Sequence, residues 1–281
     1  MDKPTRALHE VLSEAGYGVP ARILERATAA AIHQYEKGKQ VIRYAVIPTR
    51  GDRMPELNQV VAAIAPQVSG VIIVDNSDKL LIHVKQESVF VDMSITAAEP
   101  GGLPNSADRK TTVLHNPEQP PNLSRLWNLG LDYASTLADD CMQWEVAVLN
   151  DDAIVPAYWM DWLAQQMRSA GCCAAGFGPV SGATVHRTPG VTALHERLPG
   201  HAFMLAGEQN LRADEALRWW CGDNDLDMQA RKAGGTLIVP GDEVVHLYPD
   251  RSTNANPTLV AQAGLDMMTF VEKWGFRPWA I

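Results

Sequence analysis

The stretch Val146-Ala147-Val148-Leu149-Asn150-Asp151-Asp152 joins four apolar residues to a polar tripeptide. A continuous apolar run that stops at polar residues predicts a strand buried on both faces, which is typical of a parallel sheet. Two earlier runs, residues 41–47 and 71–74, have the same character, and each ends in turn-forming or polar residues. In parallel α/β sheets ligands bind beyond the carboxyl ends of the strands, so we expect all three ends to meet one ligand.

Helical patterns alternate with the predicted strands. Residues 57–64 carry apolar side chains at helical spacing after the first strand, and residues 123–137 do so before the stretch at 146–152. This alternation predicts an α/β fold with a doubly wound, mostly parallel central sheet flanked by helices. Further elements are expected as strands at 111–114, 236–239 and 243–247, β-rich pieces at 80–84 and 89–93, and helices at 159–167, 223–233 and 259–274.

The predicted domain organisation has two parts. Residues 1–40 read as an N-terminal helical appendage of two helices, through which the chain could form an oligomer, and residues 41–281 form the main domain. Within the main domain we expect a first half at about 41–152, a second half at about 153–255 and a C-terminal helix at about 258–275.

Composition narrows the classes of function. The 281 residues carry a net charge of −9 and no run of Lys or Arg, which disfavours a large nucleic-acid acceptor. No apolar run is long enough for a transmembrane segment, and the N-terminus lacks a secretion signal, so a cytoplasmic location is expected. The four cysteines show no CxxC pair and are interpreted as structural.

Acidic residues at two places could carry chemistry. Asp151 and Asp152 follow a strand at the ligand edge, and carboxylates are preferred ligands of Mg²⁺ and Mn²⁺; alternatively they cap the helix that follows. Asp223 opens a predicted helix and could act as a general base, although simple capping is the alternative. His246 could reach the same ion as Asp152, whereas an isolated histidine is more often structural.

Other candidates have weaker patterns. Trp219 and Trp220 could stack on a sugar, or belong to the core. Asp225 could bind the acceptor, but for Asp225 and Asp227 a solvated helix face is the commoner role. Asp75, after the second strand, could accept a hydrogen bond from a nucleobase or serve only as a turn residue.

Several familiar chemistries lack their motifs. The chain has no GxxxxGK[ST] loop and no GxGxxG after a strand, which argues against P-loop and dinucleotide-binding proteins. Ser181 in Val-Ser-Gly-Ala is not a nucleophile elbow, and no HExxH occurs.

Taken in order, the motifs from about Tyr44 to His246 resemble the family-2 glycosyltransferases of the GT-A fold. Tyr44-Ala45-Val46-Ile47-Pro48-Thr49-Arg50-Gly51 is similar to the family's first strand and nucleotide-contacting turn, and Val71-Ile72-Ile73-Val74-Asp75-Asn76-Ser77 to its second strand. The helix NLSRLWNLGLDYA at 122–134 carries an Asn-x-Gly signature. Asn150-Asp151-Asp152 stands in the place of the Asp-x-Asp metal motif, and Gly222-Asp223-Asn224-Asp225-Leu226 in that of Glu-Asp-x-Asp-Leu, so the first acid of each motif is replaced.

The resemblance implies an inverting glycosyltransferase with a nucleotide-diphosphate sugar as donor, UDP being favoured, and Mn²⁺ or Mg²⁺ as cofactor. Asp152 and His246 would bind the metal, and Asp223 would be the catalytic base. The half at about 41–152 would be nucleotide-binding and the half at about 153–255 acceptor-binding. The acceptor would be a glycan, a protein, a lipid-linked sugar or a modified nucleobase. The implied donor contacts are Pro48, Thr49, Arg50, Asp75, Asn128, Asn150, Asp151, Arg251 and Ser252, and the acceptor contacts are Trp219, Trp220 and Asp225.

Two other functions remain open from the sequence. A sugar-nucleotide nucleotidyltransferase would share the sheet, the acids and the nucleotide, but it needs a Gly-rich phosphate loop that residues 48–52 supply poorly. A catalytically inactive carbohydrate-binding or scaffold protein is the alternative that the Asn150 and Gly222 departures favour.

Overall fold

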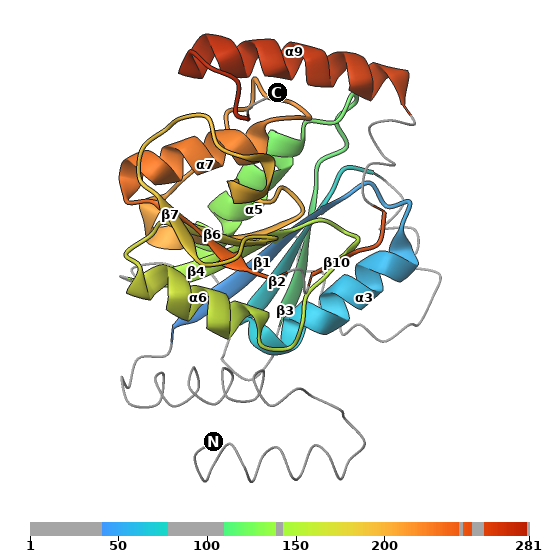
Figure 1. The fold of residues 1–281 in the computed structure, drawn as a ribbon. Helices are drawn as coiled ribbons and strands as arrows, with labels where there is room; N and C mark the ends of the chain where they lie inside the picture. The colour runs from blue at the N-terminus through green and yellow to red at the C-terminus, as the bar shows by residue number, and fades with distance from the viewer. Residues whose placement is uncertain (1–40, 78–109, 139–142, 242–243, 249–255, 280–281) are drawn as a thin grey trace, which may run out of the picture.

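The computed structural model describes residues 41–77, 110–138, 143–241, 244–248 and 256–279. The predicted helices within 1–40 and the β-rich pieces at 80–84 and 89–93 lie outside these ranges (Figure 1). None of the helices in the described ranges is long and apolar enough to cross a lipid bilayer.

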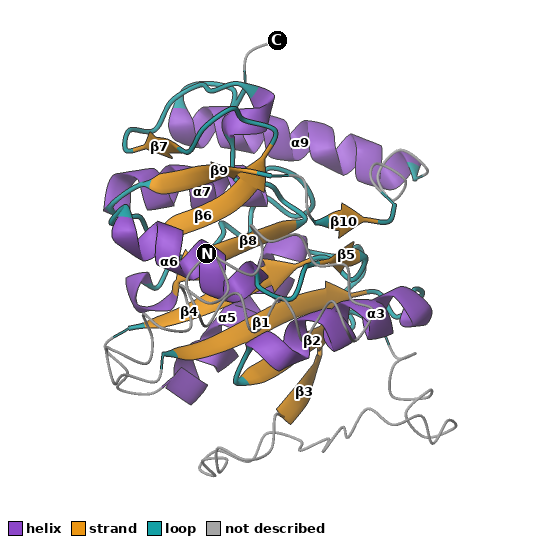
Figure 2. Ribbon diagram, turned by 60° about the horizontal axis from the view of Figure 1, so that its bottom comes forward, coloured by secondary structure: helices purple, strands orange, loops and turns teal. Residues whose placement is uncertain are grey.

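A single eight-stranded sheet forms the centre of the described chain, in the order β3-β2-β1-β4-β8-β6-β9-β7 (Figure 2). Strands β1 to β4 pair in parallel, and β6 pairs in parallel with β9. Two strands run the other way: β8 between β4 and β6, and β7 at the edge. The predicted α/β fold with a mostly parallel central sheet is therefore confirmed. The bounds are β1 Ile42–Thr49, β2 Gly70–Asp75, β3 Lys110–His115, β4 Trp144–Leu149, β6 Ala174–Gly178, β7 Thr184–His186, β8 Ala202–Ala206 and β9 Thr236–Pro240.

Helices cover both faces of this sheet (Figure 1). Helices α3 (Met54–Ile64) and α6 (Trp159–Ser169) pack on one face, and α5 (Leu123–Ala138) and α7 (Gly222–Ala233) on the other. Helix α9 (Pro257–Trp274) lies outside α7 and packs on it through Leu217, Met228 and Phe270. Short 3₁₀ turns occur at η1 (Ala65–Gln67), η2 (Leu194–Glu196) and η3 (Gly207–Gln209).

The apolar strands are continuous because both of their faces are buried. In β1, Ala45 and Ile47 contribute to the core under α3 and α6, whereas Tyr44 and Val46 contribute to the core under α5. A sheet with helices on only one side would show alternating polar residues instead.

Helix α5 approaches the sheet closely at Gly130. A Cβ atom at this position would lie 2.3 Å from Cγ1 of Val46, so a larger residue would push the helix away from β1. The glycine of the Asn-x-Gly signature therefore has a packing role, which sets the height of the helix N-terminus above the sheet edge.

The observed boundaries differ from the predictions at two places near that edge. Strand β1 continues through Pro48 to Thr49 and pairs with β2 as far as Asp75. The strand expected at 243–247 is the two-residue β10 (Val245–His246), which pairs in an antiparallel manner with β5 (Ala153–Ile154).

Candidate active site

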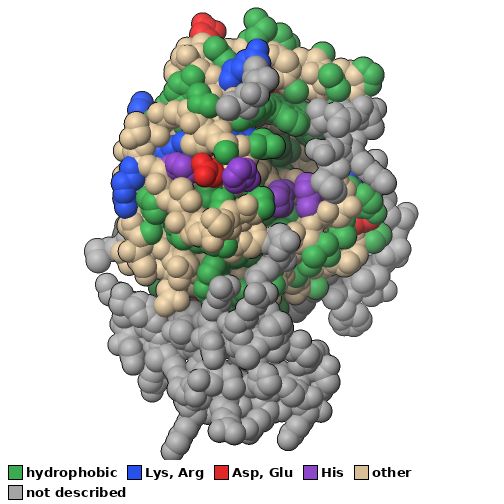
Figure 3. All heavy atoms as spheres, in the orientation of Figure 1, with side chains coloured by type: hydrophobic (Ala, Val, Ile, Leu, Met, Phe, Trp, Pro, Cys, Tyr) green, Lys and Arg blue, Asp and Glu red, His purple; other side chains and the backbone are tan. Residues whose placement is uncertain are grey.

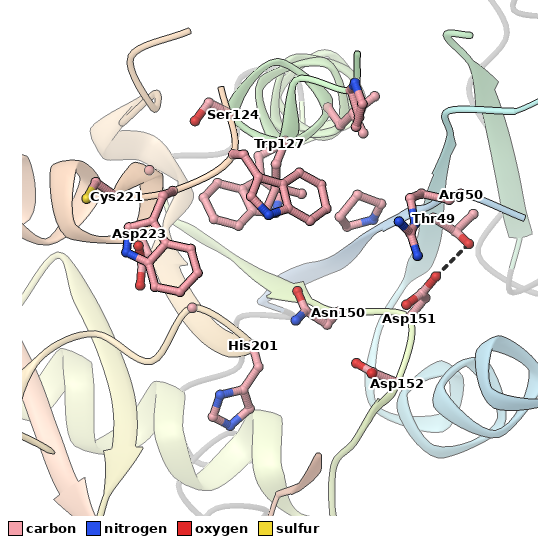
Figure 4. Close-up of a pocket in the computed structure, with 18 of the residues that line it drawn as sticks. Thr49, Arg50, Ser124, Trp127, Asn150, Asp151, Asp152, His201, Cys221 and Asp223 are labelled. Atoms are coloured by element: carbon pink, nitrogen blue, oxygen red, sulfur yellow. Dashed lines mark hydrogen bonds between the residues drawn. The ribbon is translucent and has the colours of Figure 1, made fainter. Parts of the chain in front are cut away.

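A cavity of about 510 Å³ opens at the carboxyl ends of β1 and β4. Its walls come from the ends of these strands, the start of α5, the segments around 197–201 and 219–224, and β10. Figure 4 shows Thr49, Asp151 and Asp152 on one side of the cavity and Asp223 and Cys221 on the other, with Asn150 and Trp127 between them. Asp151, Asp152 and Asp223 thus line one cavity.

Asp152 and His246 meet at one end of the cavity. The β5–β10 pairing places His246 opposite Ala153, and the Leu247 amide donates to the Asp152 carbonyl at 3.0 Å. As a result His246 Nε2 lies 3.1 Å from Oδ1 of Asp152, whose side chain is almost fully buried. Among the described residues, Oδ1 of Asp152 is a buried oxygen without a hydrogen-bond partner.

Arg53 lies against the same carboxylate. Its Nη1 atom is 2.5 Å from Oδ2 of Asp152 and 3.8 Å from Oδ1 of Asp151, and its guanidinium lies over the Tyr248 ring, 5.1 Å from the centroid. Although burial acts to raise the pKa of Asp152, the contact with His246 and the charges of His246 and Arg53 lower it. Asp152 is therefore held ionised.

Asp151 has a different environment from its neighbour. The Thr49 hydroxyl donates to Oδ2 of Asp151 at 2.8 Å. Burial, with a smaller contribution from the charge of Asp152, raises the pKa of Asp151 to about 6, while Thr49 and Arg53 act to lower it. Adjacent carboxylates at the end of one strand thus differ in proton affinity.

His201 stacks on His246 with ring centroids 4.7 Å apart and an angle of 8° between the rings. Burial, together with the charge of His246, lowers the pKa of His201 to about 4, so that it is neutral near pH 7. The His201 carbonyl also accepts from the Asn150 amide at 2.8 Å. The stacked His201 ring limits rotation of the His246 imidazole.

Asp223 lies at the opposite end of the cavity, in the first turn of α7. Burial is the main reason that its pKa is raised, against the charge of Arg197 and a hydrogen bond from Asn224. A carboxylate with increased proton affinity at a cavity wall is suited to act as a general base.

The middle of the cavity is formed by aromatic and neutral polar groups. Trp219 and Trp220 both line it, and Trp220 is 37% exposed. The amides of Trp219 and Trp220 each donate to Oδ2 of Asp266 on α9 at 2.7 Å, which fixes the backbone that carries the two rings. The buried indole nitrogen of Trp127 has no hydrogen-bond partner in the described chain.

Not all predicted site residues line this cavity. Pro48, Thr49, Arg50, Asn150, Asp151, Asp152, His246, Trp219, Trp220 and Asp223 do so. Asp75 is fully buried beside Thr49 in the β1–β2 pairing, accepts from Ser77 and lies 3.4 Å from His115 Nδ1. Arg251 and Ser252 lie outside the described residues.

Two other predicted residues make contacts within the fold instead. The Asn128 side chain accepts from the amide of Ala213 and donates to its carbonyl. Asp225 is fully buried and pairs with Lys273 of α9 at 2.8 Å, while the Trp274 indole donates to it at 2.9 Å. The alternative prediction, that Asp225 and Asp227 lie on a solvated helix face, is therefore wrong, because both side chains are buried.

The polar cavity residues that the sequence analysis did not single out include Arg53, Arg197, His201 and Tyr248. They lie in irregular segments or next to helix starts, where neither apolar periodicity nor a motif marks them. Arg53 could have been noticed only as a cation two residues after the first turn-forming segment.

The donor atoms fit a small divalent cation that also binds a ligand. No group of three His, Cys, Asp or Glu side chains converges within the described residues, so Asp152 and His246 would act as a pair. Adjacent ligands at the usual bond length of about 2.1 Å lie about 3 Å apart in an octahedral site. The separation of Oδ1 and Nε2, 3.1 Å, meets this requirement, and Mg²⁺-type ions commonly complete their shell with phosphates and water.

Comparison with known proteins gives neither a family model nor a curated sequence that matches this chain. Among solved structures it is similar to S. aureus TarS residues 1–349, with 11% identity, a TM-score of 0.47 and coverage of 84% of this chain and 74% of that one. The same protein in complex with UDP gives 10% identity and 0.47 over 81% and 66%, and in complex with UDP-GlcNAc 11% and 0.44 over 82% and 67%. The similarity to these structures is one of backbone fold alone.

Proposed function

We propose that this protein is a glycosyltransferase that moves a sugar from a nucleotide-diphosphate donor to an acceptor hydroxyl. The observation that carries the proposal is the cavity itself. It has a carboxylate–imidazole pair for a cation at one end and, across from it, a carboxylate of raised proton affinity. Displacement of a diphosphate by a hydroxyl needs these two functions on opposite sides of the reacting carbon.

Each end has an assigned role in the proposal. Asp152 and His246 would hold Mn²⁺ or Mg²⁺, which when bound supplies positive charge to the leaving diphosphate. The turn formed by Pro48, Thr49 and Arg50 would contact the nucleotide, with Asp75 beside it. Asn150 and Asp151 would contact the ribose or the donor sugar.

Asp223 would take the proton of the acceptor hydroxyl as the hydroxyl attacks the anomeric carbon. Because the base faces the diphosphate end from across the cavity, a single displacement would invert the anomeric configuration. Trp219 and Trp220 would stack on the acceptor, since aromatic rings pack well against the apolar face of a sugar. UDP is the first donor nucleotide to test, as the resemblance implies.

The face of the protein shown in Figure 3 does not favour a large nucleic-acid acceptor. On the face shown in Figure 3, the described residues carry scattered charged side chains and a row of histidines rather than a continuous basic surface. Such a face is not the kind that neutralises a nucleic-acid backbone.

The proposal is tested by screening nucleotide sugars with and without Mn²⁺ in a thermal-shift assay. A bound donor stabilises the native state by about 2.7 kcal/mol at 100 times its Kd. We expect one nucleotide sugar to raise Tm in a Mn²⁺-dependent way and to be hydrolysed slowly without acceptor. Release of pyrophosphate from a nucleoside triphosphate and a sugar 1-phosphate would instead identify a nucleotidyltransferase.

A further inference from the structure

Asn224, next to the proposed base, is a buried amide with a fixed orientation. The Arg197 guanidinium donates from Nη1 to Oδ1 of Asn224. A guanidinium has only donors, so the atom that faces it must be the amide oxygen. The amide nitrogen is thereby turned toward Asp223, and Nδ2 donates to Oδ1 of Asp223 at 2.6 Å. With the amide reversed, the Asn224 NH₂ group would face the Arg197 guanidinium, donor against donor. The Asn224 oxygen would then face the Asp223 carboxylate, acceptor against acceptor.

Arg197 is itself held in place. Its Nε atom donates to the Leu194 carbonyl at 3.2 Å, and its guanidinium lies 4.4 Å from the centroid of the Trp279 ring. Arg50 and Arg53, the other cationic side chains of the cavity wall, pair with carboxylates. Within the described chain Arg197 has no carboxylate within ion-pair distance; its charge lowers the pKa of Asp223, and its hydrogen bond fixes Asn224.

The second carboxylate oxygen of Asp223 lies against a glycine. A Cβ atom at Gly200 would be 2.7 Å from Oδ2 and 3.1 Å from Cγ of Asp223. Both residues line the cavity, and the Asn224 side chain donates to Oδ1 of Asp223 rather than to Oδ2. Because Oδ1 is fixed by Asn224, the carboxylate cannot turn away from an added methyl group without losing that bond.

We propose that Arg197 and Asn224 form a positioning relay that fixes Oδ1 of Asp223 and leaves Oδ2 as the proton-accepting atom, in a space that Gly200 provides. The relay rests on the proposed function for its use in catalysis. The charged and titratable groups that act on Asp223 are Arg197 and, from α7 itself, Asp227; Cys221 faces it as a buried thiol whose pKa is raised by burial and by Asp223.

The first test does not depend on activity. The carboxyl carbons of ¹³C-aspartate-labelled protein are titrated by NMR, and Asp223→Asn identifies the signal. Arg197 and Asn224 both lower the pKa of Asp223, so Arg197→Gln and Asn224→Ala should each raise it. Arg212→Gln, which removes an exposed pair with Asp132, is the matched control and should leave it unchanged. An unaltered Asp223 titration in both relay variants would overturn the proposal.

The second test measures transfer with the donor found by the screen. Asn224→Ala should lower kcat at least 10-fold, with donor KM within twofold, and should move the acid limb of kcat/KM to higher pH. Arg197→Lys should retain part of the rate that Arg197→Gln loses. Equal kcat in all variants would overturn the relay. If the NMR titration shifts but no nucleotide sugar is ever turned over, the relay stands and the proposed function fails.

The role of Gly200 has its own control. Gly200→Ala should lower kcat at least 10-fold, because the methyl group displaces Oδ2 of Asp223. Gly182→Ala adds the same methyl group where no atom lies within 4 Å and should leave kcat unchanged. A fully active Gly200→Ala protein would remove the glycine from the proposal.

Discussion

Oδ1 of Asp152 lies 3.1 Å from Nε2 of His246, although the two residues belong to distant parts of the chain. The pairing of β5 with β10 produces this approach, since it aligns the residue after Asp152 with His246. The orientation of both side chains is thus set by backbone hydrogen bonds before any ligand enters.

Asp152→Ala should abolish the metal dependence of donor binding. The substitution removes one of two cation ligands, and it also releases Arg53, which can then attract the diphosphate directly. The decisive quantity is therefore the ratio of the Kd values with Mn²⁺ and with EDTA, measured by calorimetry. We expect this ratio to fall to about 1, and His246→Gln to reduce it as well. Asp132→Ala, at an exposed carboxylate on α5, should keep the wild-type ratio.

Asp223→Asn should lower kcat by about 10² to 10⁴, the range in which general base catalysis contributes. Donor affinity should be unchanged, because Asp223 lies across the cavity from the cation ligands. Single-turnover kinetics at saturating donor measure the rate, and the anomeric configuration of the product measures inversion by NMR. Wild-type turnover in this variant would remove Asp223 from the base role.

Arg53→Met should strengthen the binding of Mn²⁺ in the absence of nucleotide by about fivefold or more. The guanidinium competes for Asp152 and repels a second cation, and one charge interaction near a surface is worth about 1 kcal/mol or more. Arg53→Lys keeps the charge and should bind Mn²⁺ as the wild type does. Titration of Mn²⁺ followed by electron paramagnetic resonance distinguishes these cases; weaker binding in Arg53→Met would mean that Arg53 organises Asp152 rather than competing for it.

Asp151 should make stability fall as pH rises from about 4 to about 6. Its pKa in the folded protein is about 6, above the ordinary value of 3.8, so the folded state holds a proton that the unfolded chain has lost. The associated loss of unfolding free energy is at most about 3 kcal/mol and is complete above about pH 6. Asp151→Asn removes the titrating group. The free energy of unfolding of the variant minus that of the wild type should therefore increase between pH 4 and pH 6. Urea denaturation at pH 4, 5, 6 and 7 measures it; a constant difference would contradict the raised pKa.

Asp227→Ala should destabilise the fold by about 3–5 kcal/mol, because it leaves a buried guanidinium without its counter-ion. Asp227 accepts two hydrogen bonds from Arg231, at 2.9 and 2.7 Å, and both side chains are nearly inaccessible to solvent. Asp132→Ala breaks the exposed pair with Arg212 and should cost less than about 1 kcal/mol. The free energy of unfolding in urea provides the comparison.

Apolar periodicity was sufficient to predict most of the fold. Strand β4 and helix α5 were located to within one or two residues. The strand is apolar throughout because both of its faces are buried, and the helix has one apolar face that packs on the sheet. Periodicity could not reveal that β8 runs antiparallel, since strand direction depends on long-range pairing. It also could not define β10, which is two residues long and is stabilised by β5.

The site was less predictable for a physical reason. Asp152 and His246 could be singled out because few residue types bind metal ions, and the structure places the two side chains 3.1 Å apart. Asn128 and Asp225 also lie in motifs of the resemblance, yet each ties segments of the fold together. Arg53 and Arg197 act through contacts with side chains far away in the chain, and no local pattern encodes such contacts.

The carboxylate of Asp266 has a consequence for engineering. Helix α9 is at the periphery of the fold and could be mistaken for a dispensable tail. Its Asp266 carboxylate, however, accepts hydrogen bonds from three backbone amides: that of Arg218, at 3.1 Å, and those of Trp219 and Trp220. Deleting the helix would therefore loosen the platform on which an acceptor is expected to rest. Shortened versions of the protein, or libraries that randomise this region, should lose acceptor selectivity before they lose the sheet.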